Sequence, residues 1–475
     1  CKKTRGLILE KFKSFITEQK DIEKYRVLVI STEHGSKAQT AVRLEDEAKK
    51  LGMQFYVVKM NGTYIKFDNG KYTIHKDDDE KGFELDRDNT VCFMRGTPER
   101  DSYLDLLSQL ERIGIPMVNS RICLERAADK YRTYLRIKDF GLEQPKTVLC
   151  PSPELLEKSF ENLDTKFPII LKTLRGSKGV GVLFVETERS LNSLVQTLYK
   201  MDSQTDLLMQ EYIKTDFDVR AIVLDGKVIA AMRRNVVEGD FRSNASQGAE
   251  VETIKLTKLE EDQCIHAAKS IGGIFTGVDF IPSKNRETQN PIFLEVNSSP
   301  GTENIEDATG LNISKILLEH FMNKSKRYKV PTECGYYESV TIEPFGTVVA
   351  KFDTGNSINC VLHAEDVKVV GNQVTFKYKD KTYKTKHFGT YTSITGGGED
   401  ERYVVKYDME FAGTLYKGVQ FGLDNRERMG TEVLLNRKTM RLLNVIVDPQ
   451  REFMVTTKLE MEEGEKLWAV LNIKW

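Results

Sequence analysis

Two oxygen-bearing side chains close a predicted strand late in the chain, in the stretch Pro291-Ile-Phe-Leu-Glu295-Val-Asn297. Because side chains alternate between the faces of a strand, Glu295 and Asn297 point the same way, and Asp279, on a neighbouring apolar run, supplies a third oxygen. Hard oxygen ligands too few to enclose a cation suit Mg²⁺, or Mn²⁺, completed by water and nucleotide phosphates. Each residue alone also fits a strand end facing water. The full set, followed by Ser-Ser-Pro-Gly, predicts a metal site.

A glycine-rich loop lies between two predicted strands, one ending at Lys172 and one spanning residues 182–186. Glycines let backbone amides approach phosphates, which the nearby lysines would also attract. The candidate phosphate-binding residues of the loop are Gly176, Ser177, Gly179 and Gly181. Because the loop joins two strands, it is neither a P-loop nor a dinucleotide fingerprint, and by itself it also fits an ordinary hairpin turn.

Three arginines lie within a stretch of ten residues after a predicted hairpin that turns at Asp225-Gly226: Arg233, Arg234 and Arg242. They fit a solvated strand face, because arginine is costly to bury unpaired. Beside a magnesium nucleotide, Arg234 and Arg242 would instead stabilise a phosphoryl group during its transfer. The strand before this hairpin, residues 207–213, is of the kind whose backbone can pair with an adenine edge.

A separate candidate site is the tripeptide Asp353-Thr354-Gly355, at the end of an apolar strand. Such tripeptides are also frequent in β-turns. An aspartic peptidase needs two carboxylates that share one proton, and this chain has one Asp-Thr-Gly, so the chemistry would require a homodimer in which each subunit provides Asp353. Zinc chemistry is disfavoured, because there is no HExxH and His363 and His387 lie far apart in the sequence.

Bulk properties indicate a soluble, intracellular protein of two to four domains. A chain of 475 residues is too long to fold around a single hydrophobic core. Its formal net charge of −1 gives no general attraction to nucleic acid or membrane. No apolar run is long enough to span a bilayer. The seven cysteines are scattered and never spaced as CxxC, which favours a reducing cytoplasm. The start of the sequence lacks a signal peptide's apolar core.

The predicted elements define an α+β or α/β multidomain chain. We expect an N-terminal helix over residues 1–24, a small α/β domain over 25–124, a second domain over 125–325 that begins with a helix from Ala127 through Lys138, a linker over 326–340, and an all-β barrel over 341–475. Within the small domain, apolar runs predict strands at residues 25–30 and 90–95, and Asp68-Asn69-Gly70 predicts a hairpin. The glycine-rich stretch Ser393–Arg402 is a candidate flap of the barrel.

From about Ala127 to Phe321 the chain resembles the ATP-grasp ligases, most closely the RimK-type glutamate ligases. The matching pieces, in order, are Asp129-Lys130, Lys172 with its glycine loop, Gln210-Glu211-Tyr212-Ile213, Asp218-Val-Arg220, Glu238-Gly-Asp-Phe-Arg242-Ser243-Asn244, Gly277-Val-Asp279 and Glu295-Val-Asn297.

This resemblance implies an ATP-grasp fold behind a small pre-ATP-grasp domain, and a role for each motif. Residues implied to bind ATP and its surroundings are Lys130, Lys172, the loop glycines with Ser177, Gln210, Glu211, Tyr212, Ile213, Asp218, Arg242, Ser243 and Asn244; those implied to bind metal are Asp279, Glu295 and Asn297. The implied reaction phosphorylates a carboxylate with ATP, and an amine then attacks the acyl phosphate to form an amide and release ADP. The implied substrates are an amino acid, glutamate by default, and a peptide or protein acceptor. After Asn244 the chain has Ala-Ser-Gln-Gly-Ala in place of the basic residue and paired glycines of the bacterial ligases, which bears on substrate identity.

From about Ile342 to Met454 the chain resembles the retropepsin-like RimB-type peptidases, which are often labelled ATP-dependent zinc proteases. It departs from them at Asn356, where alanine is usual, and at Asn436, where glycine is usual before Arg437. Three hypotheses remain open: a ligase joined to an aspartic peptidase, a protease regulated by an ATP-binding domain, and a ligase with an inactive β docking module.

Overall fold

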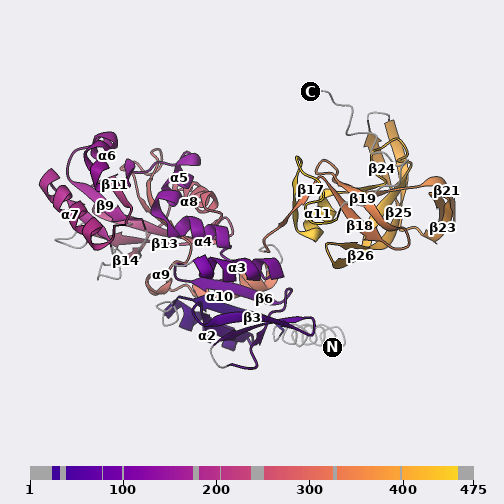
Figure 1. Cartoon of the computed structure of the whole chain (residues 1–475), viewed down its shortest axis with the longest axis horizontal. Coiled ribbons are helices and arrows are strands. Elements are labelled where there is room, and N and C mark those ends of the chain that lie inside the picture. Colours follow the sequence, from indigo (N-terminus) through magenta and orange to yellow (C-terminus); the bar gives the residue numbers. More distant parts are fainter. Residues whose placement is uncertain are drawn as a thin grey trace, which may run out of the picture. The chain divides into compact units, whose positions relative to one another are not determined.

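The computed structural model describes residues 24–32, 39–76, 79–98, 101–174, 181–203, 205–236, 251–324, 329–395 and 398–457 (Figure 1). The chain divides into two compact units, Cys1–Val330 and Pro331–Trp475, called here the first unit and the barrel unit. The helix predicted over residues 1–24 lies outside the described residues except for its last position. In the described ranges, no helix has both the length and the apolar character needed to cross a membrane.

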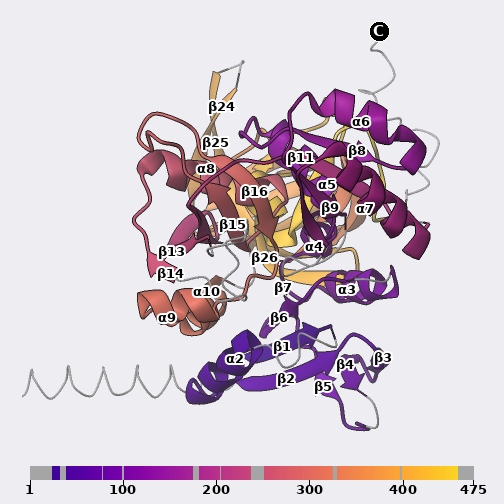
Figure 2. The same ribbon diagram turned by 90° about the vertical axis from the view of Figure 1, so that its left-hand side faces the viewer.

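The first unit begins with a parallel sheet of strand order β2-β1-β6-β7 (Figure 2). Its strands are β1 (Arg26–Ser31), β2 (Gln54–Lys59), β6 (Thr90–Arg95) and β7 (Met117–Val118), connected in part by helices α2 (Gln39–Lys50) and α3 (Asp101–Ile113). Near-continuous apolar runs bury β1 and β6, as is typical of parallel strands covered on both faces. Beside this sheet lie β3 (Thr63–Asp68), β4 (Lys71–Lys76) and β5 (Phe83–Glu84). The predicted hairpin is confirmed, because Asn69 and Gly70 between β3 and β4 both have positive φ.

Two further sheets follow in the first unit. The smaller has the order β10-β9-β11-β8 and consists of β8 (Thr147–Cys150), β9 (Ile169–Thr173), β10 (Val182–Val185) and β11 (Leu207–Glu211). A 3₁₀ turn (Pro153–Leu155) and helices α6 (Leu156–Leu163) and α7 (Glu188–Met201) accompany it. Both helices pack against the face that carries Ile169 and Leu171.

The larger sheet, which carries most of the candidate site, has the order β14-β13-β12-β15-β16. Its strands are β12 (Phe217–Leu224), β13 (Lys227–Asn235), β14 (Val251–Thr253), β15 (Phe275–Ile281) and β16 (Ile292–Asn297), and the helices around it are α8 (Lys258–Ser270), α9 (Glu303–Thr309) and α10 (Ile313–Lys324). Alternation along β12 sends Val219 and Ala221 into the core that contains α8 residues, and Ile222 into the core that contains α9 and α10 residues. Asp218 and Arg220 therefore begin the same row as Ile222, at its polar end.

The continuous helix predicted from Ala127 through Lys138 is wrong. Helix α4 (Arg121–Ala128) ends one residue before Asp129, and helix α5 (Lys130–Asp139) begins one residue after it. The Asp129 carboxylate accepts hydrogen bonds from the backbone amides of Tyr131 and Arg132, both at 2.9 Å. A short acidic side chain thus caps the amides that a new helix leaves unpaired, and the chain changes direction at Asp129.

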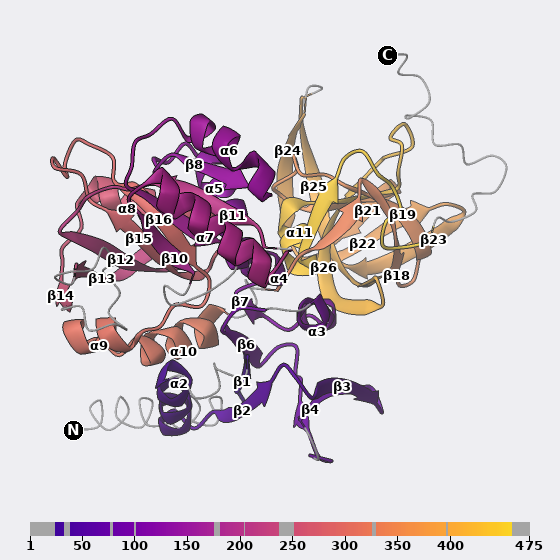
Figure 3. The same ribbon diagram turned by 60° about the vertical axis from the view of Figure 1, so that its left-hand side comes forward.

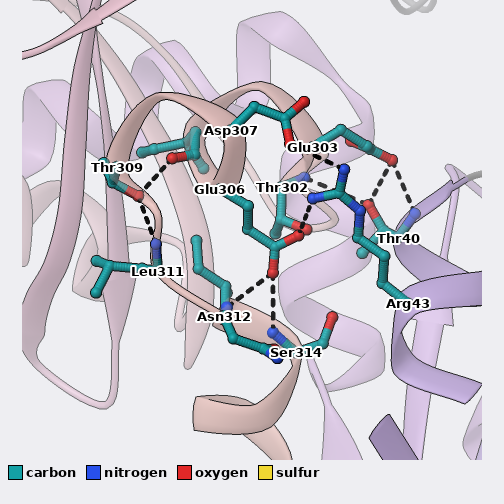
Figure 4. A network of polar contacts seen from close by, with 12 residues as sticks. Thr40, Arg43, Thr302, Glu303, Glu306, Asp307, Thr309, Leu311, Asn312 and Ser314 are labelled. Atoms are coloured by element: carbon teal, nitrogen blue, oxygen red, sulfur yellow. Dashed lines mark hydrogen bonds and ion pairs between the residues drawn. The ribbon is translucent and has the colours of Figure 1, made fainter. Parts of the chain in front are cut away.

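Helix α2 is tied to α9 and α10 of the first unit by a network of polar contacts (Figure 4). Glu303 Oε1 accepts hydrogen bonds from the Thr40 amide at 2.8 Å and the Thr40 hydroxyl at 2.7 Å. Burial alone would raise the pKa of the Glu303 carboxyl, but the Thr40 hydrogen bonds hold this pKa below its usual value. Arg43 donates to Glu306, whose second oxygen accepts from the Ile313 amide at the start of α10. Helix α10 also packs beside α2 through a shared apolar core (Figure 3), so these contacts fix the first sheet against the segment that follows β16.

The barrel unit contains the predicted β barrel. Strand order β18-β19-β27-β20-β26-β25-β24 is closed by pairing of β18 with β25. These strands are β18 (Tyr337–Ile342), β19 (Gly346–Phe352), β20 (Cys360–His363), β24 (Thr390–Thr395), β25 (Gly398–Phe411), β26 (Thr414–Asp424) and β27 (Val433–Leu435). The predicted flap stretch falls in the β24–β25 hairpin. Phe352, Phe376 and Phe421 fill the interior.

The remaining elements of the barrel unit flank the closed sheet. They are β17 (Thr332–Gly335), β21 (Glu365–Val370), β22 (Gln373–Tyr378), β23 (Lys381–Lys386), α11 (Arg437–Leu443) and β28 (Val445–Asp448). Strand β17 pairs in parallel with β28, and β22 lies between β21 and β23. Asn436, one of the two departures from the peptidase pattern, caps α11 by accepting a hydrogen bond from the Thr439 amide at 2.9 Å.

Candidate active site

A deeply buried ion pair of the candidate site joins Asp218 on β12 to Arg234 on β13. The two residues are register partners on adjacent strands, and each is only 4% exposed. Arg234 Nε and Nη2 donate to the two carboxylate oxygens of Asp218, both at 2.7 Å. This parallel two-bond geometry is the strong form of an arginine–carboxylate contact, and it fixes both side chains. Arg234, predicted as a catalytic residue, is thus buried between carboxylates.

A second arginine pairs across the other edge of β12. Arg220 donates through Nε to Asp279 Oδ1 at 2.6 Å and through Nη2 to Asp279 Oδ2, and Arg234 Nη2 lies 3.0 Å from the same Oδ2. Burial alone would raise the pKa of the Asp279 carboxyl, but Arg220 and Arg234 hold this pKa well below its usual value. Asp279 is therefore an ionised, buried carboxylate at physiological pH.

The row continues to Glu295 on β16. Glu295 is the register partner of Asp279, and Asn297 is the partner of Gly277 one pleat away. Arg220 Nη2 lies 3.8 Å from Glu295 Oε1, and Asn297 Nδ2 donates to the same oxygen at 2.9 Å. Arg234, Asp218, Arg220, Asp279 and Glu295 form one row across four strands, called here the charge ladder.

The end of the charge ladder suits a hard cation. Two carboxylates of neighbouring strands, Asp279 and Glu295, meet beside the amide oxygen of Asn297, and 43% of the Glu295 side chain is exposed. Among the described residues no group of three or more His, Cys, Asp and Glu side chains could hold a metal by itself. The donor set therefore fits Mg²⁺, which takes part of its oxygen shell from protein and part from water and phosphate.

Two lysines complete the polar region: Lys172 on β9 of the neighbouring sheet and Lys130 at the start of helix α5. Lys172 Nζ donates to Gln210 Oε1 at 2.7 Å, and Lys130 Nζ donates to the Thr173 carbonyl at 3.0 Å. Burial lowers the pKa of Lys172 to about 8, against the opposing attraction of Glu295. Burial likewise lowers the pKa of Lys130, again opposed by Glu295. Desolvated ammonium groups of this kind gain most when an anionic ligand such as a phosphate arrives.

The strand predicted over residues 207–213, with a backbone able to pair with an adenine edge, is the interior strand β11, and it ends at Glu211. β11 runs between β9 and β8, and Gln210 is committed to Lys172 and to the Thr147 hydroxyl. The Glu211 carboxylate accepts from the Lys146 amide at 3.2 Å, and Tyr212 packs edge-on against Phe184 with ring centroids 5.0 Å apart. Beyond β11, the backbone of Tyr212 and Ile213 is not part of the sheet.

Several predicted residues fall outside the described ranges. They are Gly176, Ser177, Gly179, Arg242, Ser243 and Asn244. Of the predicted loop, Gly181 is described: its φ is +80°, and a Cβ there would lie 2.3 Å from the Thr173 hydroxyl oxygen, so only glycine fits.

Arg220 is the site residue to which the sequence analysis gave no role. The signal was present, because Asp218-Val-Arg220 places a second charged side chain on the face that carries Asp218. Nothing in the sequence revealed which acid it would meet, since that depends on the register of β12 against β15.

The barrel unit places Asp353 directly after β19. Its carboxylate oxygen Oδ1 accepts from the Gly355 amide at 2.9 Å, and its own amide donates to the Leu435 carbonyl at 3.0 Å. Thr354 and Gly355 are exposed. Burial lowers the pKa of Arg426, partly offset by attraction to Asp424 and Asp353, so a buried guanidinium contributes to the field at Asp353. One chain presents one such aspartate.

Comparison with known proteins agrees with both resemblances. Residues 127–321 match the model of the RimK-like ATP-grasp domain, and residues 334–458 match that of the retropepsin-like aspartic endopeptidase RimB. The probable alpha-L-glutamate ligase of Psychromonas ingrahamii is 31% identical over 287 residues, covering 60% of this chain and 91% of that protein. The corresponding protein of Methanococcoides burtonii is 30% identical, covering 62% and 95%.

The chain belongs to the RimK-like glutamate ligase family. Its first unit thus contains an ATP-grasp domain of a carboxylate–amine ligase, and its barrel unit is a retropepsin-like domain. Among solved structures, that of the ATP-grasp ligase PsnB complexed with minimal precursor aligns with a TM-score of 0.49 and 19% identity, covering 63% of this chain and 99% of that one.

Proposed function

We propose that this RimK-like ligase joins an amino acid, with glutamate as the default, to the carboxyl end of a peptide or protein acceptor, with formation of ADP through an acyl phosphate. The observation that carries the proposal is the charge ladder, which ends at the oxygen ligands Asp279, Glu295 and Asn297. Family membership supports the reaction class, and the glutamate ligase names of the relatives support the choice of amino acid.

The residues of the chain have separable roles in this proposal. Lys130 and Lys172 attract the phosphates of ATP, because burial disfavours their charged ammonium groups and an arriving anion stabilises that charge. Asp279, Glu295 and Asn297 would hold Mg²⁺, which when bound neutralises the phosphate charge that develops during transfer. Arg220 and Arg234 keep Asp279 ionised and in place, so in this scheme they are positioning residues. Arg242, outside the described ranges, keeps its predicted role at the reacting phosphoryl group.

The ligase proposal is tested with purified full-length chain, ATP, Mg²⁺, a panel of amino acids and a panel of peptides with free carboxyl ends. ADP release that depends on both co-substrates, with a matching mass increase of the acceptor, is expected. The variant Glu295→Ala should lose this activity, and Glu287→Ala, an exposed glutamate between β15 and β16, should keep it. If ADP is never released above the ATPase background, the proposal is refuted.

For the barrel unit we propose an aspartic peptidase that forms when two copies bring their Asp353 side chains together. Support comes from the family match and from the position of Asp353 at the end of a strand in a closed barrel. Two carboxylates would then share a proton, so that one activates water and the other donates to the leaving group. The peptidase would trim or process the products of the ligase.

The two alternatives predict different outcomes. If the barrel unit is the principal enzyme and ATP regulates it, Asp353→Asn should abolish all activity while Glu295→Ala only modulates it. If the barrel unit is a docking module, removal of residues 326–475 should raise the KM for the acceptor and remove no peptidase activity.

A further inference from the structure

The carboxyl ends of β1 and β6 form a topological switch point. After β1 the chain passes through α2 to β2 on one side, whereas β6 pairs with the other side of β1. In open parallel sheets, ligands bind in the crevice beyond such strand ends. Ser31 and Arg95 are the last residues of β1 and β6, and they are register partners. Arg95 therefore stands at the place where this architecture binds ligands.

Within the described ranges, Arg95 is a buried cation that no acid pairs with. It is 6% exposed, and its one hydrogen bond to the described residues runs from Nη2 to the Pro300 carbonyl at 2.9 Å. Among the described residues, the buried Nε has no hydrogen-bond partner, and no carboxylate lies within 4.0 Å of the guanidinium. The Glu303 carboxylate attracts the Arg95 guanidinium electrostatically without forming an ion pair with it, and it accepts its hydrogen bonds from Thr40. Burial lowers the pKa of Arg95 to about 10, a measure of its uncompensated desolvation.

Arg26 provides a comparison for Arg95. Both arginines have a buried Nε without a hydrogen-bond partner among the described residues, but only Arg26 pairs with an acid there. Arg26 lies at the opposite, amino-terminal end of β1. Its Nη2 lies 3.5 Å from the Glu84 carboxylate, and its Nη1 donates to the Glu84 carbonyl at 3.3 Å. Arg26 lies on the neighbouring strand and is less buried, with 18% of its side chain exposed, so it serves as the acid-paired control for Arg95.

Arg95 is also close to the charge ladder. It contacts Pro300, three residues beyond the predicted metal ligand Asn297. A Cβ at Gly277 would lie 2.9 Å from Pro300 Cβ and 3.8 Å from Arg220, so Pro300 and Arg220 flank the same glycine. Ser299 fixes this segment to the end of β6, since its hydroxyl donates to the Met94 carbonyl at 3.2 Å and accepts from the Gly96 amide at 3.1 Å. The segment that follows β16 thus holds the Arg95 guanidinium next to the candidate active site.

We propose that Arg95 binds a free carboxylate of a substrate and is a specificity-determining residue of the ligase. The inference rests on the proposed function for the choice of substrate, which is an α-amino acid or a peptide carboxyl end. A planar guanidinium with unused N–H groups matches the two oxygens of a carboxylate, and a buried cation that lacks an internal acid gains its counter-charge from the ligand. The added amino acid and the acceptor both carry this group, so the test separates them.

The test is isothermal titration of the full chain in the presence of Mg²⁺ and a non-hydrolysable ATP analogue. One arm compares L-glutamate with its α-carboxamide, and the other compares a short peptide with its C-terminal carboxamide. For wild type, we expect the carboxylate form to bind about 10- to 100-fold more tightly in one arm, the range of a charge-assisted hydrogen bond at a buried site. The arm that shows the preference identifies the source of the carboxylate.

The variants give the proposal its decisive readouts. Arg95→Met should remove the preference for the carboxylate and leave the affinity for the ATP analogue unchanged, whereas Arg95→Lys should retain part of the preference. Because a buried guanidinium without an acid costs stability, Arg95→Met should also unfold at a temperature equal to or above that of wild type. Arg26→Met should keep the preference of the wild type and should not gain stability.

The proposal is overturned if wild type binds the carboxylate and carboxamide forms equally in both arms, or if Arg95→Met keeps the preference. Loss of folding in Arg95→Met, with Arg26→Met still folded, would also count against it, since it would show a structural role. These results are separate from those that judge the proposed function: a wild-type chain that releases ADP with no carboxylate preference refutes the role of Arg95 alone. A chain that shows the preference and releases no ADP supports Arg95 and refutes the ligase proposal.

Discussion

Replacement of Asp279 by asparagine removes the charge at the centre of the charge ladder and keeps the size of the side chain. In the wild type, this carboxylate accepts from Arg220 Nε at 2.6 Å and lies 3.0 Å from Arg234 Nη2. An asparagine would turn an N–H₂ group toward one of these cations. The variant therefore tests whether the ladder is a single electrostatic unit.

The expected cost follows from what remains around the two arginines. Removal of one partner of a buried ion pair costs ~3–5 kcal/mol when the remaining charge is left alone. Here Arg234 keeps Asp218, and Arg220 keeps Glu295 at 3.8 Å, so the loss should be smaller, about 2–4 kcal/mol. Ligase activity should fall to background, because Asp279 is a proposed ligand of the metal.

The pH dependence of the unfolding free energy tests whether the ionised form of Asp279 stabilises the fold. The pKa of Asp279 is lower in the folded chain than the ~3.9 of an unfolded aspartate. Its contribution is therefore fully present above about pH 4 and is lost as the pH falls through the folded pKa. The difference in unfolding free energy between wild type and Asp279→Asn should be constant from pH 6 to pH 8 and should shrink below about pH 4.

Native-state hydrogen exchange of peptides from β12 and β15 measures the loss of stability in the strands that carry Asp218, Arg220 and Asp279. The free energy of opening measured by exchange in these strands should fall by about 2–4 kcal/mol in Asp279→Asn, and that in the barrel unit should not change. Asp262→Asn, which removes a helix-surface carboxylate paired with Lys258, is the control and should leave protection unaltered. Equal protection of wild type and Asp279→Asn in β12 and β15 would refute the ladder as a cooperative unit.

Two further predictions follow from single side chains. Because the pKa of Lys172 is lowered to about 8, kcat/KM for ATP should fall as the pH rises from 7 to 9. Lys172→Met should lower kcat/KM and flatten this pH profile, whereas Lys166→Met, at an exposed position, should change neither. A wild-type kcat/KM that does not depend on pH would contradict the role assigned to Lys172. Asp353→Asn should abolish peptide cleavage and leave ADP-forming ligation intact, with the exposed Asp366→Asn as control, and cleavage that survives in Asp353→Asn would exclude the aspartic mechanism.

Most of the architecture follows from local patterns in the sequence. Apolar runs predicted the buried strands β1 and β6, the Asp-Asn-Gly turn predicted the β3–β4 hairpin, and Asp225-Gly226 predicted the turn between β12 and β13. These features depend on neighbours in the chain, so composition and period suffice. The break at Asp129 was missed because its carboxylate caps a new helix inside an apparently continuous helical pattern.

The candidate site was predictable in its residue types and not in its pairings. Asp218, Asp279 and Glu295 were identified from the motifs, yet their contacts depend on the registers of β12 with β13 and β15 and of β15 with β16. A shift of one residue would send each side chain to the opposite face, and only the packed sheet excludes it. The isolation of Arg95 likewise depends on the fold, because no local pattern shows that a buried arginine lacks an acid.

The path of oxygen during the reaction tests the central claim most directly. An acceptor peptide that supports ADP release is labelled with ¹⁸O in its terminal carboxylate and incubated with the ligase, ATP, Mg²⁺ and the amino acid. If the site transfers phosphate to that carboxylate, each ADP should be accompanied by one phosphate that carries a single ¹⁸O. Release of unlabelled phosphate, or of AMP and pyrophosphate, would contradict the acyl-phosphate mechanism.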